Sequence, residues 1–362
     1  MIGLTKSGFK VAMAGMALAF SAHAEFKVVG YLMGAPNIPA GQYKKLTHVI
    51  WSFARPADNG TISGIDAANL NKLVTEAHAN KVKVFVALGG GGNHDNGWAV
   101  ATSTDAGRQA LAKACMDAVH TYNLDGIDFD WEYPDGPQVP GYNAEVKLLA
   151  VALHAEGKQL SAAVTYNDWP KSFPNNDLFS YFDFLNIMIY DNPPPHSTVA
   201  HVNTSLDIWI KGKGLPKEKF IVGCPFYGPG GMYKDIVAAN PAAAWVDNNG
   251  AEGYNSIPTM KKKTEIGLKQ AGGMMFWQLA QDAVGNLSLL SAVNDVIVKS
   301  GARGTLTLRP EPQASRSGML CKGRGGIAFG IPGNLGLPLS RFDPSGRRLD
   351  DLTAPIEPAH WP

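Results

Sequence analysis

The segment 124–133 reads LDGIDFDWEY and alternates apolar and acidic residues from Ile127 onward. Successive side chains of an extended strand point to opposite faces, so Asp128, Asp130 and Glu132 share one face. The other face carries Ile127, Phe129 and Trp131. A strand that is acidic on one side and strongly apolar on the other is expected to line a confined site with its acids.

The three carboxylates would lie about 6 to 7 Å apart along such a strand. In a confined site they cannot all stay ionised, so at least one should hold a proton at neutral pH. A protonated carboxylic acid beside an ionised one can protonate a leaving oxygen and stabilise developing positive charge. The pattern therefore predicts acid catalysis.

Three other interpretations are helix caps, solvated charges and a metal cage. A solvated face does not require a large apolar residue at every intervening position. An Asp-rich calcium loop needs a different register with a central glycine. Catalysis remains the favoured interpretation.

Apolar runs of strand length alternate with helical patterns between residues 25 and 300. The runs are 26–33, 46–53, 82–89, 124–132, 159–166, 182–190, 220–227 and 273–278. Alternation of this kind predicts a parallel sheet with crossover helices, and the length is close to the roughly 250 residues of a (β/α)8 barrel. We predict an α/β fold, a single (β/α)8 TIM barrel over 25–300 without a large insertion domain, followed by an irregular C-terminal tail.

Four helical patterns are clear between the predicted strands. They are 67–80 opened by Asp66, a helix opened by Asp105, 142–156 and 286–299. Cys115 lies on the apolar stripe of the second helix and Cys224 on the outward face of a strand, so both are predicted to be buried free thiols. With Cys321 the cysteines number three, which makes no disulfide framework.

Active sites of such barrels lie at the C-terminal ends of the strands. The predicted strand ends are rich in aromatic and polar residues, namely Tyr31, Phe53, Glu132, Tyr166, Tyr190, Asp191, Tyr227 and Trp277. Any one aromatic residue could simply pack in the core. Because several strands end alike, and because aromatic faces stack on the apolar faces of pyranose rings, a sugar-binding groove is favoured.

The pattern Asp125-x-x-Asp128-x-Asp130-x-Glu132, with a Gly and a Trp at fixed places, resembles the signature strand of the family 18 glycoside hydrolases, the chitinases and their relatives. The sixth predicted strand ends Met188-x-Tyr190-Asp191 and resembles the Met-x-Tyr-Asp motif of that family. The eighth ends in Trp277 and resembles the family's last strand. The likeness spans nearly the whole predicted barrel.

The resemblance implies roles for the matching residues. Glu132 would protonate the glycosidic oxygen, Asp130 would orient the 2-acetamido group of the substrate, and Asp128 would share a proton with Asp130. Tyr190 would hydrogen-bond the acetamide and Trp277 would form the floor beneath the sugar. The expected substrate-binding set is completed by Asp191, Tyr31, Met188 and Tyr227.

Two departures from the family pattern stand out. The third strand ends Ala87-Leu88-Gly89-Gly90, where many members have a Ser before the Gly pair, so the hydrogen bond to the innermost Asp is expected to be replaced or missing. Pro229 stands where some relatives place an Arg. Neither position touches the expected proton donor.

The resemblance implies an enzyme that cleaves chitin or N-acetylglucosamine oligosaccharides by substrate-assisted, retaining hydrolysis. Residues 228–272 are too few and too loop-like for the insertion that walls the cleft of many members, so we expect an open groove and endo-type cutting. Two alternatives are an endo-β-N-acetylglucosaminidase acting on N-glycan cores and a non-catalytic chitin-binding lectin. Such lectins usually lack the last Glu, which is present here as Glu132.

The N-terminus predicts a secretory signal over residues 1–24. Lys6 and Lys10 precede the apolar run 11–20, which is too short to span a bilayer, and an Ala-x-Ala site ends at Ala24. A buried N-terminal helix is the alternative. We expect a secreted or periplasmic protein that is a monomer.

The net charge of +1, from 32 basic and 31 acidic residues, argues against a nucleic acid or an anionic membrane as partner. The glycines at 89–92 lack the Lys-Ser/Thr of a phosphate loop, and the histidines show no metal-ligand spacing. We therefore expect no cofactor and no metal.

Residues 301–362 differ in composition from the rest. Their basic residues are arginines except for Lys322, prolines are frequent, and hydrophobic periodicity is missing. We predict a largely disordered tail, and we interpret it as a shifted reading frame, a read-through or a cloning junction. An ordinary linker is the alternative.

Removing residues 301–362 should therefore leave both hydrolytic activity and the melting temperature unchanged, because the tail contributes no core. Thermal unfolding and activity assays of the full and shortened chains check this. A clear loss of either property would contradict the interpretation.

Overall fold

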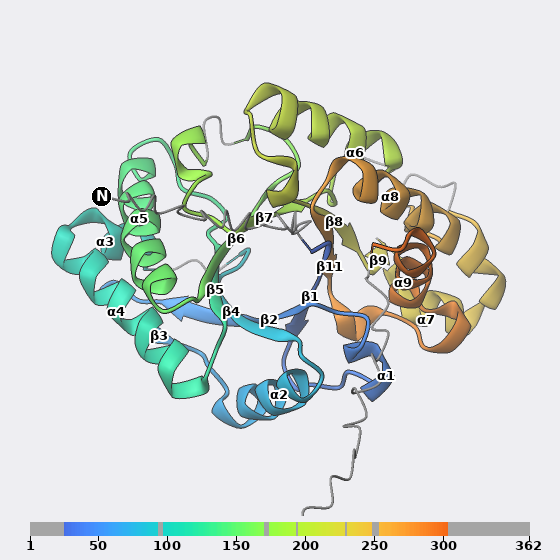
Figure 1. The fold of residues 1–362 in the computed structure, drawn as a ribbon, viewed down its shortest axis with the longest axis horizontal. Coiled ribbons are helices and arrows are strands. Elements are labelled where there is room, and N and C mark those ends of the chain that lie inside the picture. Colours follow the sequence, from blue (N-terminus) through green and yellow to red (C-terminus); the bar gives the residue numbers. More distant parts are fainter. Residues whose placement is uncertain are drawn as a thin grey trace, which may run out of the picture. The chain divides into compact units, whose positions relative to one another are not determined.

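Parallel strands close into a barrel in the computed structural model, which describes residues 25–92, 97–169, 174–192, 195–228, 230–247 and 253–302. In chain order they are β1 (Lys27–Met33), β2 (His48–Pro56), β4 (Lys83–Gly89), β5 (Gly126–Asp130), β6 (Gln159–Thr165), β7 (Phe184–Met188), β8 (Phe220–Pro225) and β11 (Gly273–Trp277). Each pairs with the next, and β1 also pairs with β11, which closes the ring (Figure 1). The predicted (β/α)8 barrel is confirmed.

Helices surround this ring. They are α1 (Ala40–Tyr43), α2 (Ala67–Ala79), α3 (Trp98–Ser103), α4 (Asp105–Tyr122), α5 (Val139–Ala155), α6 (Val199–Leu206), α7 (Tyr233–Ala239), α8 (Ile257–Gln270) and α9 (Leu289–Ser300). The shorter elements are β3 (Ile62–Ser63), β9 (Tyr227–Gly228), β10 (Gly231–Met232), η1 (Asn176–Leu178), the π-helical η2 (Asp207–Gly212), η3 (Lys217–Lys219), η4 (Pro241–Trp245), η5 (Leu279–Gln281) and η6 (Gly285–Leu287).

Side chains at the helix ends explain where the predicted boundaries hold and where they shift. Asp66 caps α2 as predicted, whereas α4 is capped by Thr104 with Asp105 in its first turn. Helix α5 begins before residue 142 because Pro140 fits a first turn that needs no amide donor. Helix α9 begins after residue 286 because Ser288 supplies its cap.

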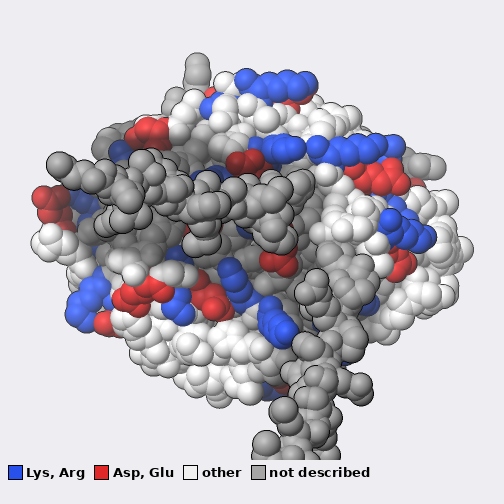
Figure 2. Space-filling model, in the orientation of Figure 1, with Lys and Arg blue, Asp and Glu red and all other residues white. Residues whose placement is uncertain are grey.

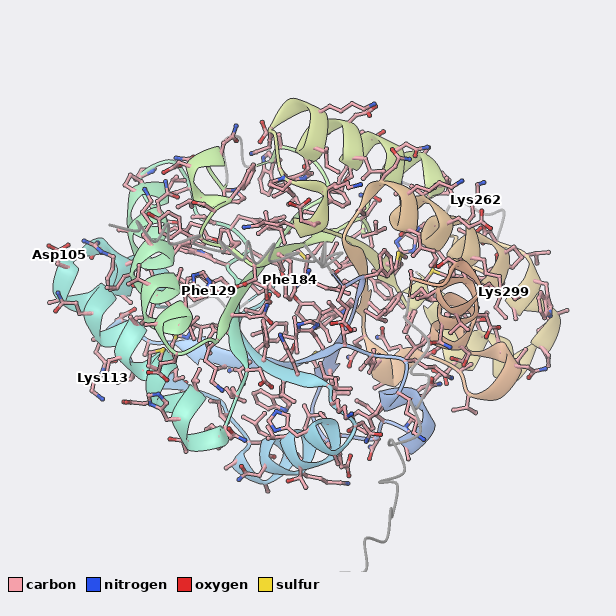
Figure 3. All side chains as sticks on the ribbon, viewed as in Figure 1. Asp105, Lys113, Phe129, Phe184, Lys262 and Lys299 are labelled. Atoms are coloured by element: carbon pink, nitrogen blue, oxygen red, sulfur yellow. The ribbon has the colours of Figure 1, made fainter. Side chains whose placement is uncertain are left out.

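The alternation of strand β5 divides its side chains between two cores. Phe129 and Trp131 belong to the layer between the strands and the helices, where Trp98 of α3 stacks on Trp131 at 5.2 Å between ring centroids. A second cluster is enclosed by the barrel and includes Phe184 of β7. Figure 3 labels Phe129 and Phe184. Asp128 points to the enclosed side and hydrogen-bonds side chains of β1, β6 and β7.

Two glycines end strand β5 earlier than predicted. A Cβ at Gly89 would lie 2.3 Å from the carbonyl oxygen of Asp130, and the Gly90 amide donates to that oxygen at 2.6 Å. The end of β4 thus approaches the end of β5 too closely for a side chain at position 89, and the pairing of the two strands ends at Gly89 and Asp130. Glu132 therefore lies beyond the strand, and Tyr190 likewise lies beyond β7.

The segment 228–272 is less loop-like than predicted. Its described residues form the β9–β10 hairpin, α7, η4 and α8, and these described residues contain no further sheet. Cys115 and Cys224 are buried and free, as predicted, whereas Cys321 lies outside the described residues. The predictions for residues 1–24 and for 303–362 also lie outside them.

Two surface properties bear on the expected partners. Basic and acidic side chains are interspersed on the described parts of the face in Figure 2, in keeping with the net charge of +1. None of the helices formed by the described residues has the length and apolar character of a membrane span.

Replacing Gly126 by Ala should destabilise the barrel by about 1 to 3 kcal/mol, because the site is overpacked. The new Cβ would lie 2.3 Å from the carbonyl oxygen of Gln159 and 2.7 Å from the Phe85 ring. Urea unfolding measures the effect. Gly41→Ala in α1 is the matched control, since nothing lies within 4 Å of its added Cβ. Equal stability of the two variants would contradict the packing argument.

Candidate active site

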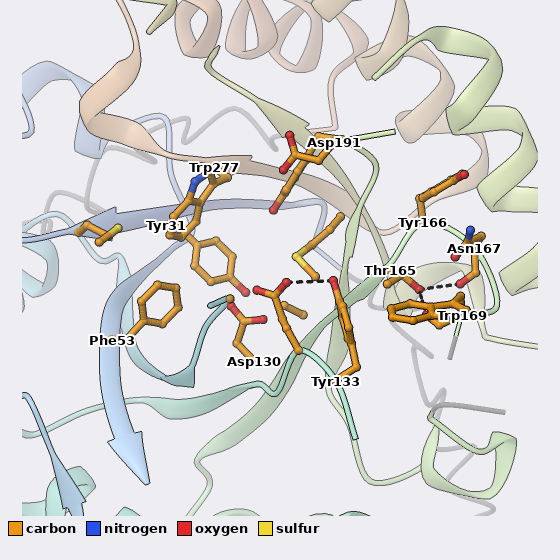
Figure 4. Close-up of a pocket in the computed structure, with 16 residues that line it drawn as sticks. Tyr31, Phe53, Asp130, Tyr133, Thr165, Tyr166, Asn167, Trp169, Asp191 and Trp277 are labelled. Atoms are coloured by element: carbon orange, nitrogen blue, oxygen red, sulfur yellow. Dashed lines mark hydrogen bonds between the residues drawn. The ribbon is translucent and has the colours of Figure 1, made fainter. Parts of the chain in front are cut away.

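A cavity of about 520 Å³ opens at the carboxyl ends of the strands. Figure 4 shows Tyr31, Phe53 and Trp277 on one side of it, Tyr166 and Trp169 on the other, and Asp130 and Tyr133 between them. Glu132, Met188, Tyr190 and Asp191 also line it. Seven of the nine predicted site residues thus line one cavity, Asp128 lies beneath it, and Tyr227 stands behind Asp191.

Asp128 is fully buried and accepts hydrogen bonds from three neighbouring side chains. The Tyr31 hydroxyl donates at 2.7 Å, the Ser161 hydroxyl at 2.5 Å and the Asn186 amide at 3.1 Å. Burial raises the pKa of Asp128 to about 6, although the three hydrogen bonds favour the ionised form and act against that rise. The hydrogen bond missing from the third strand is therefore replaced by one from Ser161 on β6.

Asp130 lies between Asp128 and Glu132. Burial, followed by the charges of Glu132 and Asp128, holds its pKa well above the usual carboxyl range. Its Oδ1 atom has no hydrogen-bond partner among the described residues. Because like charges this close cannot all persist, Asp130 retains its proton toward neutral pH.

Glu132 is half-buried at the cavity surface. The Tyr133 hydroxyl donates to its Oε2 atom at 2.9 Å. A Cβ at Gly91 would lie 3.3 Å from its Oε1 atom, so the glycine leaves room for the carboxyl group. The arrangement places an acid where it can reach a bound ligand.

Tyr190 faces the acids from the end of β7. Burial, followed by the charges around it, raises the pKa of its phenol well above the usual value, so it remains a hydrogen-bond donor. The neighbouring Asp191 has a left-handed backbone at φ 53° and accepts a hydrogen bond from the Tyr227 hydroxyl at 2.7 Å. Tyr227 therefore acts on the cavity through Asp191, not as part of the lining.

Aromatic rings form one side of the cavity. The Trp277 ring stacks on Phe53 at 5.6 Å with an interplanar angle of 23°, and lies 5.7 Å from the Tyr31 ring. The rings of Phe53 and Tyr31 hold Trp277 in place. The Trp277 ring also lines the cavity, where it offers an apolar surface to a ligand. A flat saturated ring with polar edges fits beside such a platform.

Some residues of the site were not predicted. Ser161 lies on the enclosed face of β6, and the strand alternation could have placed it there. Tyr133 and Trp169 follow strand ends, and no sequence pattern indicated their direction. Among the described residues no group of three or more His, Cys, Asp or Glu is arranged to hold a metal ion.

The fold and the cavity together define a barrel glycosidase, with stacked acids at the strand ends beside aromatic walls. The profile of "Glycosyl hydrolases family 18" matches residues 27–282. The chain belongs to this family, which confirms the resemblance seen in the sequence.

Relatives and solved structures agree with this assignment. A family 18 chitinase from the chitin utilization locus of Flavobacterium johnsoniae is 28% identical, with a TM-score of 0.69 over 77% of this chain and 96% of that one. A chitinase from Bacteroides thetaiotaomicron is 26% identical, with a TM-score of 0.68 over 76% of this chain and 98% of that one. Endochitinase 1 of Metarhizium anisopliae is 25% identical over 340 residues, covering 70% of this chain and 79% of the relative.

Asp128→Asn should change how stability depends on pH. Because the folded-state pKa of about 6 exceeds the ordinary 3.8, the proton stabilises the folded protein fully at low pH and this contribution is lost as pH rises through about 6. The variant should therefore gain about 3 kcal/mol relative to the wild type between pH 3.5 and 7. Urea unfolding across that range measures the difference.

Ser161→Ala provides a matched comparison. It removes a hydrogen bond that favours ionised Asp128, so the loss of stability should move to higher pH. A constant difference between Asp128→Asn and wild type across the range would contradict the raised pKa.

Proposed function

We propose that this protein is a secreted, endo-acting chitinase that hydrolyses β-1,4 linkages of N-acetylglucosamine polymers by substrate-assisted retention. The observation that carries the proposal is the contact of Asp130 with Glu132 in a cavity that Tyr190 and Trp277 also line. This set offers an acid for the glycosidic oxygen and a second carboxyl group for an acetamide. The names of the relatives point to the same substrate.

Glu132 is the proposed general acid. It lies at the cavity surface, where it can reach the oxygen between two sugars, and protonating that oxygen allows the leaving sugar to depart. The same carboxylate then takes a proton from the incoming water. The hydrogen bond from Tyr133 holds the group in place.

Asp130 is proposed to act on the acetamide. It would accept a hydrogen bond from the acetamide N–H, and its charge would stabilise the positive charge that forms as the acetamide carbonyl oxygen attacks the anomeric carbon. Tyr190 would hold the same acetamide with its phenol. Two displacements at the anomeric carbon retain its configuration, and no enzyme carboxylate forms a bond to the sugar.

Asp128 is proposed to tune Asp130 from beneath. It is buried with a pKa of about 6, so it can share the proton that Asp130 must release when the substrate's positive charge develops. Tyr31 and Ser161 hold Asp128 in place by hydrogen bonds. We assign the catalytic work to Glu132, Asp130, Asp128 and Tyr190.

The endo-type cleavage and the export of the protein are proposed from other parts of the chain. The described residues of 228–272 add no sheet larger than the two-stranded β9–β10 hairpin, so we propose an open groove that accepts internal links of a polymer. The N-terminal pattern supports export, and the near-zero net charge suits a neutral polysaccharide. Trp277 is proposed as the floor beneath the sugar that is attacked, with Met188 and Asp191 beside it.

Incubation with chitohexaose and, separately, with a high-mannose glycopeptide tests the proposal. We expect internal cleavage of chitohexaose only, with the new reducing ends formed first as the β anomer. Cleavage of the glycopeptide alone would indicate an N-glycan endoglycosidase, and binding of chitohexaose without cleavage would indicate a lectin. Either result, or a sugar ester trapped on an Asp or Glu, would contradict the proposal.

Glu132→Gln tests whether Glu132 is the general acid. Loss of a positioned general acid lowers the rate by about 10² to 10⁴, so turnover of chitohexaose should nearly vanish while its binding persists. Isothermal titration measures binding and product analysis measures turnover. Retention of full activity would remove Glu132 from the assigned role.

A further inference from the structure

A lysine is buried beside the segment that follows strand β7. Lys263 of α8 has no exposed surface. Its Nζ atom donates to the Ser197 carbonyl oxygen, to the Ser197 hydroxyl at 2.8 Å and to the Asn255 side-chain oxygen at 2.5 Å. Three acceptors use all three N–H donors of an ammonium group. The contacts therefore fit a charged lysine, although burial lowers the pKa of Lys263.

Ser197 connects this lysine to the end of β7. Its backbone is left-handed at φ 54°, and its hydroxyl, which accepts from the lysine, donates to the Ile189 carbonyl oxygen at 2.6 Å. Its amide donates to the Asn192 side-chain oxygen at 3.1 Å. Ile189 and Asn192 stand on either side of the Tyr190–Asp191 pair in the chain. The serine thus holds both sides of the pair that lines the cavity.

His196 supplies a second connection to Asp191. It is buried, and its Nδ1 atom accepts a hydrogen bond from the Asp191 amide at 3.4 Å. The same nitrogen lies 3.9 Å from the Asp191 carboxylate. The imidazole also packs against Tyr227, whose hydroxyl donates to that carboxylate. A nitrogen that accepts from an amide carries no proton, so this contact requires a neutral imidazole.

Several titratable groups face His196 from the elements around it. Burial lowers the pKa of His196 most, Lys263 and His201 lower it further, and Asp191 and the Gly253 backbone act against them. Because a nearby positive charge disfavours protonation, Lys263 helps to keep the imidazole neutral. The titratable groups are Asp191 after β7, His201 of α6, Tyr227 of β9, Lys263 of α8 and, lining the same small cavity as His196, Asp247 and Tyr254.

We propose that Lys263 is a positioning residue for the hydrolysis, and that through Ser197 and His196 it fixes the Tyr190–Asp191 pair beside the acids. This step rests on the proposed function, in which the Tyr190 phenol holds the acetamide of the attacked sugar. Lys263 is not among the described residues that line the cavity, so its effect passes through this pair. The connection through Ser197 acts at every pH at which the lysine is charged, whereas the connection through His196 acts only while the imidazole is neutral.

The pH dependence of kcat for chitotetraose tests the connection through His196. Lys263→Met should lower kcat about tenfold at pH 7, and the loss should grow as the pH falls toward 5, because His196 now takes up a proton more easily. In Lys263→Met with His196→Asn the loss should not grow, since the Asn oxygen can accept from the Asp191 amide and does not titrate. A loss that is equal at every pH in Lys263→Met, or that still grows in the double variant, would overturn the proposal.

Ser197→Gly tests the connection through the serine. Glycine suits the left-handed backbone and keeps the carbonyl acceptor, so only the hydroxyl link between Lys263 and Ile189 is lost. We expect kcat to fall about tenfold at every pH with little change in KM, because poor positioning acts mainly on the transition state. This variant decides the question if Lys263→Met does not fold, and an unchanged kcat would count against the proposal.

Lys219→Met is the matched control. Lys219 of η3 is half-buried and donates to the Phe179 and Phe182 carbonyl oxygens at 2.8 and 2.6 Å, before β7 begins. Its removal breaks similar lysine–carbonyl hydrogen bonds, so it should lower the melting temperature but leave kcat and its pH dependence unchanged. A loss of kcat as large as that of Lys263→Met would show a general effect of stability and refute the specific role.

A spectroscopic measurement separates this proposal from the proposed function. Histidine-selective NMR of the full chain follows the protonation of His196 without turnover, and His196→Asn identifies its signal. Lys263→Met should raise the midpoint of that signal by about one pH unit. If the wild type does not cleave chitotetraose, the chitinase proposal fails, and the midpoint still decides whether Lys263 acts on His196. Equal midpoints in the two proteins would show that it does not.

Discussion

The buried carboxyl group of Asp128 is the interaction on which the site depends. It lies on β5 inside the barrel and is held by Tyr31 of β1, Ser161 of β6 and Asn186 of β7. Four of the eight strands thus meet at one carboxyl group. A buried charge is tolerated only with such partners, and these hydrogen bonds also fix the strand whose next two acids face the cavity.

From this anchor the acids form a series from the enclosed core to the surface. Asp128 is fully buried with three donors, Asp130 is buried with one oxygen that has no hydrogen-bond partner in the described part of the chain, and Glu132 is half-buried beside Tyr133. Among the described residues the Oδ1 atom of Asp130 therefore remains for a ligand to satisfy. The period of two along β5 places Asp128 and Asp130, and Glu132 follows directly after the strand.

The sequence predicted the parts of this site that depend on strand alternation. Asp128 and Asp130 face the barrel interior because every second residue of β5 must, and Trp277 and Tyr190 were placed by the ends of their own strands. Glu132 was predicted within the strand but lies beyond it, because the end of β5 is set by where its pairing with the neighbouring strands stops. Trp169 could not be placed, since its direction depends on a turn anchored by Lys213 and Trp209, residues distant in the sequence.

The close approach of Gly89 to the end of β5 has a consequence for the evolution of the chain. Gly89 and Gly90 both have positive φ angles, and the first has no space for any side chain above the Asp130 carbonyl. Random drift can therefore replace many surface residues at little cost, but any other residue at position 89 would place a Cβ 2.3 Å from the Asp130 carbonyl oxygen and force the backbone beside the acids to move. A strand end without any functional side chain thus restricts which sequences can carry the acids.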